Sequence, residues 1–146
     1  MPISNLTANI CKKCNLIYTN PTVKPTVYDK IYENTIIGSF RNIKNAASNL
    51  KKLNYFTELV DKYIIKNKKI LDIGCGQGEL LQNIKKKFKI SPKKIFAIEP
   101  SKKIVKFLKK NTSFNVKNTF LDKLNDKKKY DFLILDNVFE HFDYPS

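Results

Sequence analysis

The chain has 146 residues, 42% of them apolar, and a formal net charge of +15, a size and composition that fit one ordinary domain with a hydrophobic core. No window approaches the roughly 18 apolar residues of a membrane-spanning helix, and the first residues lack the pattern of a signal peptide. The cysteines are odd in number, which argues against a secreted disulfide framework, so we expect a cytoplasmic protein with no membrane partner.

The positive charge comes almost entirely from lysine. The chain holds 28 Lys and Arg against 13 Asp and Glu, and Arg41 is the only arginine. Such a balance can indicate nucleic acid, an anionic membrane or an acidic substrate. The lysines, however, form short dispersed runs where helix faces and loop tips are expected, in a chain that is also rich in Asn and Ile. We interpret them mainly as solvated surface, which disfavours a nucleic-acid partner.

Residues 1–27 are predicted to be a small N-terminal appendage with Cys11, Cys14 and three prolines. The alternating segment NLIYTNP within it predicts a short strand or hairpin arm that leads into a loop. The two cysteines supply only two of the four ligands of a tetrahedral zinc site, so we assign no metal.

Residues 28–66 are predicted to be a helical lead-in. Apolar residues recur three and four positions apart, which predicts two helices with a break near Gly38 and Ser39. The residues with this period are Tyr28, Ile31, Tyr32, Leu50, Leu53, Phe56, Leu59, Val60, Tyr63 and Ile64.

Residues 67–146 alternate between short apolar strands and amphipathic helices. The segments KKILDI, KKIFAIE and YDFLILD predict strands, SFNVKNTF predicts a weaker one, and GELLQNIKKKF and SKKIVKFLKKN predict helices. Ser101 is placed to cap the second helix. Residues 130–136 are too continuously apolar to have a solvent-exposed face. The pattern is typical of an α/β fold whose parallel sheet is covered on both sides.

The segment ILDIGCGQGELL has the features of a nucleoside site. A strand precedes Gly74, Gly76 and Gly78, a helix follows them, and Glu99 ends the next strand about twenty residues later, where a ribose-binding acid is expected. Ligands of parallel sheets bind beyond the carboxyl ends of the strands, where glycines let the backbone come close. Asp72 would repel a pyrophosphate and attract an ammonium group, which disfavours a dinucleotide-dependent oxidoreductase.

These residues resemble the class I S-adenosylmethionine-dependent methyltransferases, whose first motif is similar to LDIGCGQG. The resemblance implies a Rossmann-like parallel sheet sandwiched by helices, in the strand order 3-2-1-4-5-7-6, with S-adenosylmethionine as the cofactor. FAIEPS resembles the second motif, which places Glu99 on the ribose hydroxyls. The cofactor-binding residues that the resemblance implies are Asp72, Gly74, Cys75, Gly76, Gly78, Glu99, Pro100, Ser101, Phe120, Leu121, Asp136 and Asn137.

The resemblance assigns these residues to different parts of the cofactor. Pro100 and Ser101 are placed beside the adenine, which Phe120 and Leu121 also line, and Asp136 lies near the methionine end. Cys75 is interpreted as a small residue packed behind the loop rather than as a nucleophile.

The segment YDFLILDNVFEHFDYP is similar to the fourth strand and following loop of many bacterial family members. We predict that His141, the only histidine, is the general base and that Glu140 assists it. The alternative is that His141 packs against the cofactor site and orients a neighbour. In the similar ubiquinone-pathway O-methyltransferases an acid stands in the place of Asn137 and is associated with a divalent metal, so the metal interpretation is weakened here.

The leader CKKCNLIYTNP resembles that of a subgroup with a zinc-ribbon-like element, which includes sugar C-methyltransferases. This implies a small-molecule methyl acceptor, such as a sugar nucleotide or polysaccharide precursor. The chain stops just past the fourth strand, so we expect a fragment or one half of a split methyltransferase. A C-terminal half or a second copy would then cover the open sheet edge.

Two other functions stay open. The chain could bind the cofactor without turnover, or it could methylate nucleic acid. The second is disfavoured because DNVFEH stands where many base methyltransferases have an NPPY-like motif.

Overall fold

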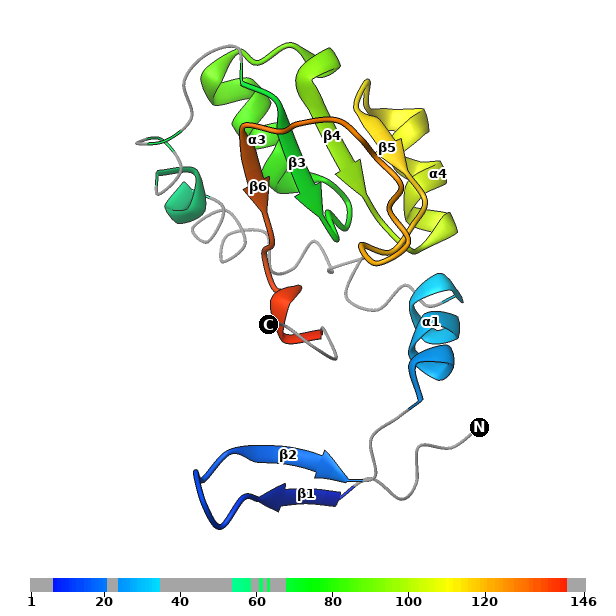
Figure 1. Cartoon of the computed structure of the whole chain (residues 1–146). Helices are drawn as coiled ribbons and strands as arrows, with labels where there is room; N and C mark the ends of the chain where they lie inside the picture. Colours follow the sequence, from blue (N-terminus) through cyan, green and yellow to red (C-terminus); the bar gives the residue numbers. More distant parts are fainter. Residues whose placement is uncertain are drawn as a thin grey trace, which may run out of the picture.

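The computed structural model describes residues 7–20, 24–34, 54–58, 61, 63 and 68–141. Its centre is a parallel sheet in the order β5-β4-β3-β6 (Figure 1). The strands are β3 (Ile70–Ile73), β4 (Ile95–Ile98), β5 (Asn115–Lys117) and β6 (Phe132–Ile134). Each lies inside a segment predicted to be a strand, and their order confirms the first four positions of the predicted arrangement.

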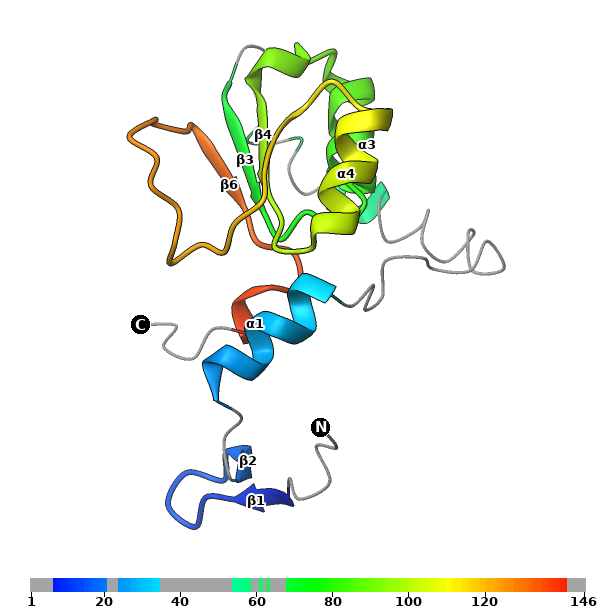
Figure 2. The same cartoon turned by 90° about the vertical axis from the view of Figure 1, so that its right-hand side faces the viewer.

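Helices α3 (Glu79–Phe88) and α4 (Lys102–Asn111) cover one face of the sheet, as the edge-on view in Figure 2 shows. Each helix buries apolar residues at positions i, i+1 and i+4, which share one side of a helix. Burying one such side chain contributes roughly 1.5–3 kcal/mol. The buried helix residues are Leu80, Leu81, Ile84, Ile104, Val105 and Leu108.

The other face of the sheet is covered differently. Leu71, Ile73 and Ile98 form its apolar cluster, and Leu124 and Tyr130 pack on them from the connection between β5 and β6. This connection, residues 118–131, contains neither helix nor strand. A parallel sheet needs both faces covered, and in the described part of the chain a non-helical segment meets that need on this side.

Strand β6 departs from the sequence prediction. It spans only Phe132–Ile134 rather than residues 130–136. Leu133 is 55% exposed, so the prediction that this segment has no solvent-exposed face is wrong at that residue. The physical reason is position: β6 is the outer strand of the described sheet, with β3 on one side only.

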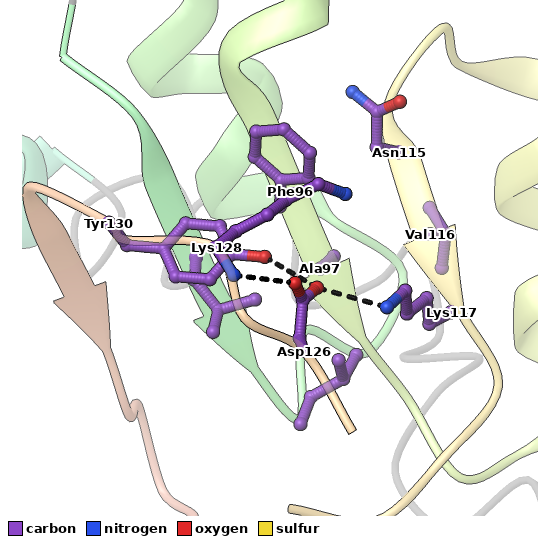
Figure 3. A pocket seen from close by; sticks show the side chains of 10 residues that line it. Phe96, Ala97, Asn115, Val116, Lys117, Asp126, Lys128 and Tyr130 are labelled. Carbon is purple, nitrogen blue, oxygen red and sulfur yellow. Dashed lines mark hydrogen bonds and ion pairs between the residues drawn. The ribbon is translucent and has the colours of Figure 1, made fainter. Parts of the chain in front are cut away.

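A network around Asp126 fastens the β5–β6 connection to the sheet (Figure 3). Its carboxylate pairs with the Lys117 ammonium at 2.9 Å and accepts the Lys128 N–H at 2.9 Å and the Tyr130 hydroxyl at 3.0 Å. The Tyr130 ring meets Phe96 of β4 edge to face, with 5.3 Å between ring centroids. A cavity of about 220 Å³ lies among these residues. Because its polar groups bond to one another, we regard this cavity as structural.

The network shifts the pKa values of both its acidic groups. The Lys117 hydrogen bond, followed by that of the Lys128 N–H, lowers the pKa of Asp126 to about 2. Burial, followed by the hydrogen bond to Asp126, raises the pKa of Tyr130 to about 12. Both shifts favour the protonation states that hold the network together at neutral pH.

The N-terminal residues form a hairpin and a helix. Strands β1 (Thr7–Ile10) and β2 (Ile17–Asn20) pair antiparallel, which confirms the predicted hairpin arm. Helix α1 (Pro25–Asn34) begins three residues before the predicted start, and proline suits a first helical turn. Residues 54–58 are helical, as predicted. The predicted break and part of the helical pattern lie outside the described residues: Gly38, Ser39, Leu50, Leu53, Leu59, Val60 and Ile64.

Two short 3-10 helices complete the described structure. They are η2 (Pro92–Lys94) before β4 and η3 (Phe139–His141) after β6. Ser101 is the N-cap residue of α4, as predicted, but its side chain makes no capping hydrogen bond. No helix in the described part of the chain has the length and hydrophobicity to cross a membrane.

We predict that Asp126→Asn lowers the urea midpoint at pH 7 more than Asp122→Asn does. Both changes remove one negative charge from the same connection, but Asp122 lies on its exposed part. Because the pKa of Asp126 is depressed to about 2 in the folded state, its contribution is present above about pH 4 and is lost as the pH falls through 2. The difference between the variants should therefore shrink between pH 4 and pH 2. Equal midpoints at pH 7 would contradict the role given to Asp126.

Candidate cofactor site at the carboxyl edge of the sheet

The loop between β3 and α3 holds three glycines in left-handed backbone conformations. Their φ values are +70° at Gly74, +51° at Gly76 and +72° at Gly78, a region in which residues with a Cβ are strained. The N–H groups of Gly74 and Cys75 both donate to the Ile98 carbonyl, at 2.9 and 3.3 Å. The end of β4 thus fixes the loop at the carboxyl edge of the sheet.

The surroundings of the glycines differ. A Cβ on Gly74 would lie 2.6 Å from Cγ2 of Val138, and one on Gly78 would lie 2.9 Å from Cδ2 of Leu108. A Cβ on Gly76 would meet nothing within 4 Å. Gly74 and Gly78 are therefore needed for packing inside the protein, whereas the bare backbone of Gly76 faces open space that a ligand can approach.

Glu99 joins the glycine loop to the turn before α4. Its two carboxylate oxygens accept the Gly76 N–H at 3.1 Å and the Ser101 N–H at 2.9 Å. The residue is only 7% exposed. Burial raises the pKa of Glu99, and the hydrogen bonds from Ser101 and Gly76 oppose that rise. An acid stands at the tip of the second strand, as predicted, next to the open backbone of Gly76.

Asp72 is buried beside two other acids. Burial is the largest cause that raises the pKa of Asp72 well above its usual range, and the charges of Asp136 and Glu99 raise it further. These acids come from the ends of β3, β6 and β4, which are neighbours in the sheet. A cationic group placed among them would relieve their repulsion. The carboxyl edge therefore has the electrostatic character that binds a cation.

Two buried polar atoms near the loop have no hydrogen-bond partner in the described part of the chain. They are Nε2 of Gln77, inside the glycine loop, and Oγ of Ser101, the N-cap residue of α4. Buried polar groups nearly always have a partner, so each can serve a bound polar molecule. Gln77 did not figure in the sequence prediction, although its place between two loop glycines could have suggested it.

Cys75 lies where the sequence predicted, packed against the cluster between the sheet and its helices. Burial, followed by the charges of Asp72 and Glu99, raises the pKa of its thiol well above the usual range. A thiol that stays protonated is a poor nucleophile, in line with a packing role.

The other predicted cofactor residues lie in the loops after β4, β5 and β6. Pro100 forms the turn next to Glu99. Phe120 lies under the Lys123 ammonium, 4.8 Å from its ring centroid, and Leu121 is 37% exposed. Asn137 is exposed in a left-handed turn with φ of +55°. Contacts of these residues with a cofactor stay a prediction.

His141 lies in η3 and is exposed. Its ring meets that of Tyr32 from α1 edge to face, with 5.9 Å between centroids. Helix α1 lies beyond the carboxyl ends of the strands in both views (Figures 1 and 2). The N-terminal helix thus borders the candidate site, a contact that the helical period of α1 alone could not have revealed. The Glu140 side chain lies outside the described residues.

The predicted cysteine pair lies on the β1–β2 hairpin. The N–H of Cys14, followed by that of Lys13, lowers the pKa of the Cys11 thiol through hydrogen bonds. Among the residues that the structure describes, no group of three or more His, Cys, Asp or Glu side chains is arranged to hold a metal ion.

We predict that Gly74→Ala destabilises the protein more than Gly76→Ala. A left-handed alanine costs about 1–2 kcal/mol at either position. Gly74→Ala adds the overlap with Val138, and overpacking costs about 1–3 kcal/mol. Urea unfolding should show the difference, and Val138→Ala in the Gly74→Ala background should recover part of it. Equal losses at both glycines would contradict the packing role of Gly74.

Comparisons with known proteins agree with this geometry. The chain is 33% identical over 94 residues to ribosomal RNA small subunit methyltransferase A of Mycoplasmopsis synoviae (strain 53), a match that covers 61% of this chain and 35% of that protein. The plantazolicin methyltransferase BpumL in complex with a monoazolic desmethylPZN analog and SAH superimposes with a TM-score of 0.56 and 25% identity, over 75% of this chain and 43% of that one. Coclaurine N-methyltransferase bound to N-methylheliamine and SAH superimposes with a TM-score of 0.52 and 19% identity, over 75% of this chain and 34% of that one.

The chain thus spans about a third of the length of the curated relative and less than half of the solved structures. The low identity to coclaurine N-methyltransferase shows a common fold only. A match to the family described as "Methyltransferase domain" covers residues 42–146, which is most of the chain. The α/β fold with its parallel sheet and the glycine loop confirm the predicted resemblance, and the chain belongs to the methyltransferase-domain family.

Proposed function

We propose that the chain is the cofactor-binding part of an S-adenosylmethionine-dependent methyltransferase. The observation that carries this proposal is the meeting of Asp72, Glu99 and Asp136 beside the open backbone of Gly76. S-adenosylmethionine is a nucleoside with a cationic sulfonium and an ammonium group, so it suits acids next to a bare glycine turn. Structures of similar proteins hold SAH, its product, which supports this choice.

The described residues suggest how the parts of the cofactor are recognised. Asp72 and Asp136 supply negative charge for the amino-acid end. Glu99 supplies carboxylate oxygens for the ribose hydroxyls. These hydroxyls would replace the N–H groups of Gly76 and Ser101, from which the Glu99 carboxylate now accepts hydrogen bonds. Pro100, together with the buried hydroxyl of Ser101, lies on the side assigned to the base. When bound, the cofactor supplies an electrophilic methyl group for in-line displacement.

We further propose a small-molecule acceptor, with His141 as the base that takes its proton and Glu140 as the assisting acid. The exposure of His141 beside α1 leaves its ring accessible to an acceptor. A sugar nucleotide or polysaccharide precursor follows from the resemblance of the N-terminal leader. Ribosomal RNA is the second candidate acceptor, because a ribosomal RNA methyltransferase is 33% identical over 94 residues.

Calorimetric titration with SAH tests the cofactor site. We expect saturable binding to the chain, weakened about tenfold or more by Asp72→Asn and by Glu99→Gln, since hydrogen bonds to charged groups contribute about 1.5–3 kcal/mol. Asp122→Asn, which removes the same charge elsewhere, should leave the affinity unchanged. Absence of binding by the folded chain would overturn the proposal.

The same Asp72→Asn variant should be more stable than the original chain at neutral pH in the absence of cofactor. The pKa of Asp72 is raised in the folded state, so the folded protein loses stability as the pH rises through that pKa, and asparagine removes this loss. A thermal melt at pH 7 measures the effect. A lower midpoint for the variant would show that Asp72 stabilises the fold and does not merely serve the ligand.

We predict that His141→Gln lowers methyl transfer by about 10²–10⁴-fold, the usual contribution of a general base, and leaves SAH affinity within about twofold. The assay would offer methyl-tritiated S-adenosylmethionine with a panel of sugar nucleotides or with ribosomal RNA. Tritium in the sugar fraction supports the first acceptor class, and tritium in RNA replaces it with the second. Loss of SAH affinity in the variant would instead place His141 in the cofactor site.

A further inference from the structure

Asn118, which lies just past the end of β5, holds the turn that carries Glu99 through two hydrogen bonds. Its side-chain Nδ2 donates to the Glu99 carbonyl at 2.9 Å and to the Pro100 carbonyl at 2.7 Å. A primary amide nitrogen offers two N–H groups, so one side chain satisfies two neighbouring carbonyls at once. Asn118 is not among the residues that the sequence predicted for the site.

A backbone contact reinforces this attachment. The Glu99 N–H donates to the Lys117 carbonyl at 3.1 Å, one residue before Asn118. Both the N–H and the carbonyl of Glu99 are therefore bonded to the end of β5. With its backbone fixed in this way, the Glu99 carboxylate is held between the N–H groups of Gly76 and Ser101.

We propose that Asn118 is a positioning residue for cofactor binding, which acts through Glu99. By bonding the carbonyls of Glu99 and Pro100, Asn118 fixes the turn from which the Glu99 carboxylate reaches the glycine loop. The same turn leads into Ser101, whose buried hydroxyl has no partner in the described structure. This inference rests on the proposed function, because it assigns Glu99 to the ribose of the cofactor.

The chain provides a matched control at the opposite end of the same strand. Nδ2 of Asn115 lies 3.4, 3.3 and 3.2 Å from the carbonyl oxygens of Pro92, Lys93 and Ile95, so its two N–H groups are shared among three acceptors. Like Asn118, it is an exposed asparagine that joins β5 to the backbone around β4. It does so at the amino end of the parallel strands, away from the edge that carries Glu99.

The experiment compares Asn118→Ala with Asn115→Ala in calorimetric titrations with SAH and in thermal melts. Both variants lose hydrogen bonds of the same kind, so we expect similar small decreases in the thermal midpoint. Asn118→Ala should raise the Kd for SAH about three- to tenfold, the equivalent of one net hydrogen bond, whereas Asn115→Ala should change it less than about twofold. Asn118→Asp, which keeps the size but points acceptors at two carbonyls, should weaken binding at least as much.

A double-mutant cycle tests whether Asn118 acts through Glu99. In a Glu99→Gln background, Asn118→Ala should change the Kd by less than about twofold, because a coupled pair is not additive. An undiminished effect in that background, or an unchanged Kd in Asn118→Ala alone, would overturn the positioning role while the cofactor site stands. Failure of the unmutated folded chain to bind SAH would overturn the proposed function, and this inference with it.

Discussion

The burial of Asp72 and Glu99 at one edge of the sheet, with Asp136 close by, is the constraint on which the candidate site depends. The proximity of Asp72, Glu99 and Asp136 follows from the parallel topology, because neighbouring strands that run in one direction end side by side. Burial makes their charges costly, and the raised pKa values of Asp72 and Glu99 reflect this. These buried acids lower the stability of the empty protein, and a cationic ligand would relieve that cost. At these residues, what favours binding therefore works against the stability of the protein without its ligand.

Packing around the glycine loop holds the carboxyl edge of the sheet in place although acids gather there. Gly74 lets Val138, from the turn after β6, lie against the loop backbone, and Gly78 admits Leu108 of α4. The N–H groups of Gly74 and Cys75 are bonded to β4. The loop is therefore held by β4, by α4 and by the turn after β6, while the position of a Gly76 Cβ faces open space. Rigid positioning of this kind lowers the entropy that binding must overcome.

The sequence predicts the parts of the fold that depend on local pattern. Strand positions, helix faces and the acid at Glu99 follow from periodicity and spacing, since these set which side chains share a face. It could not predict the partners of Tyr32, Val138 or Asn118, because each contact joins segments that are remote in the chain. The exposure of Leu133 was missed although the resemblance placed this strand at an open sheet edge, because an apolar run by itself predicts burial.

The end of β5 contacts both the β5–β6 connection and the turn that carries Glu99. The Lys117 side chain pairs with Asp126 and so fastens the connection that covers the second face of the sheet. The Lys117 carbonyl accepts the N–H of Glu99, and the next residue, Asn118, bonds the Glu99 and Pro100 carbonyls. Two adjacent residues therefore hold the β5–β6 connection on one side and the turn of Glu99 and Pro100 on the other. The backbone and the side chain of a strand residue point in different directions. One short strand can therefore hold both the β5–β6 connection and the Glu99 turn, without a helix between these two segments.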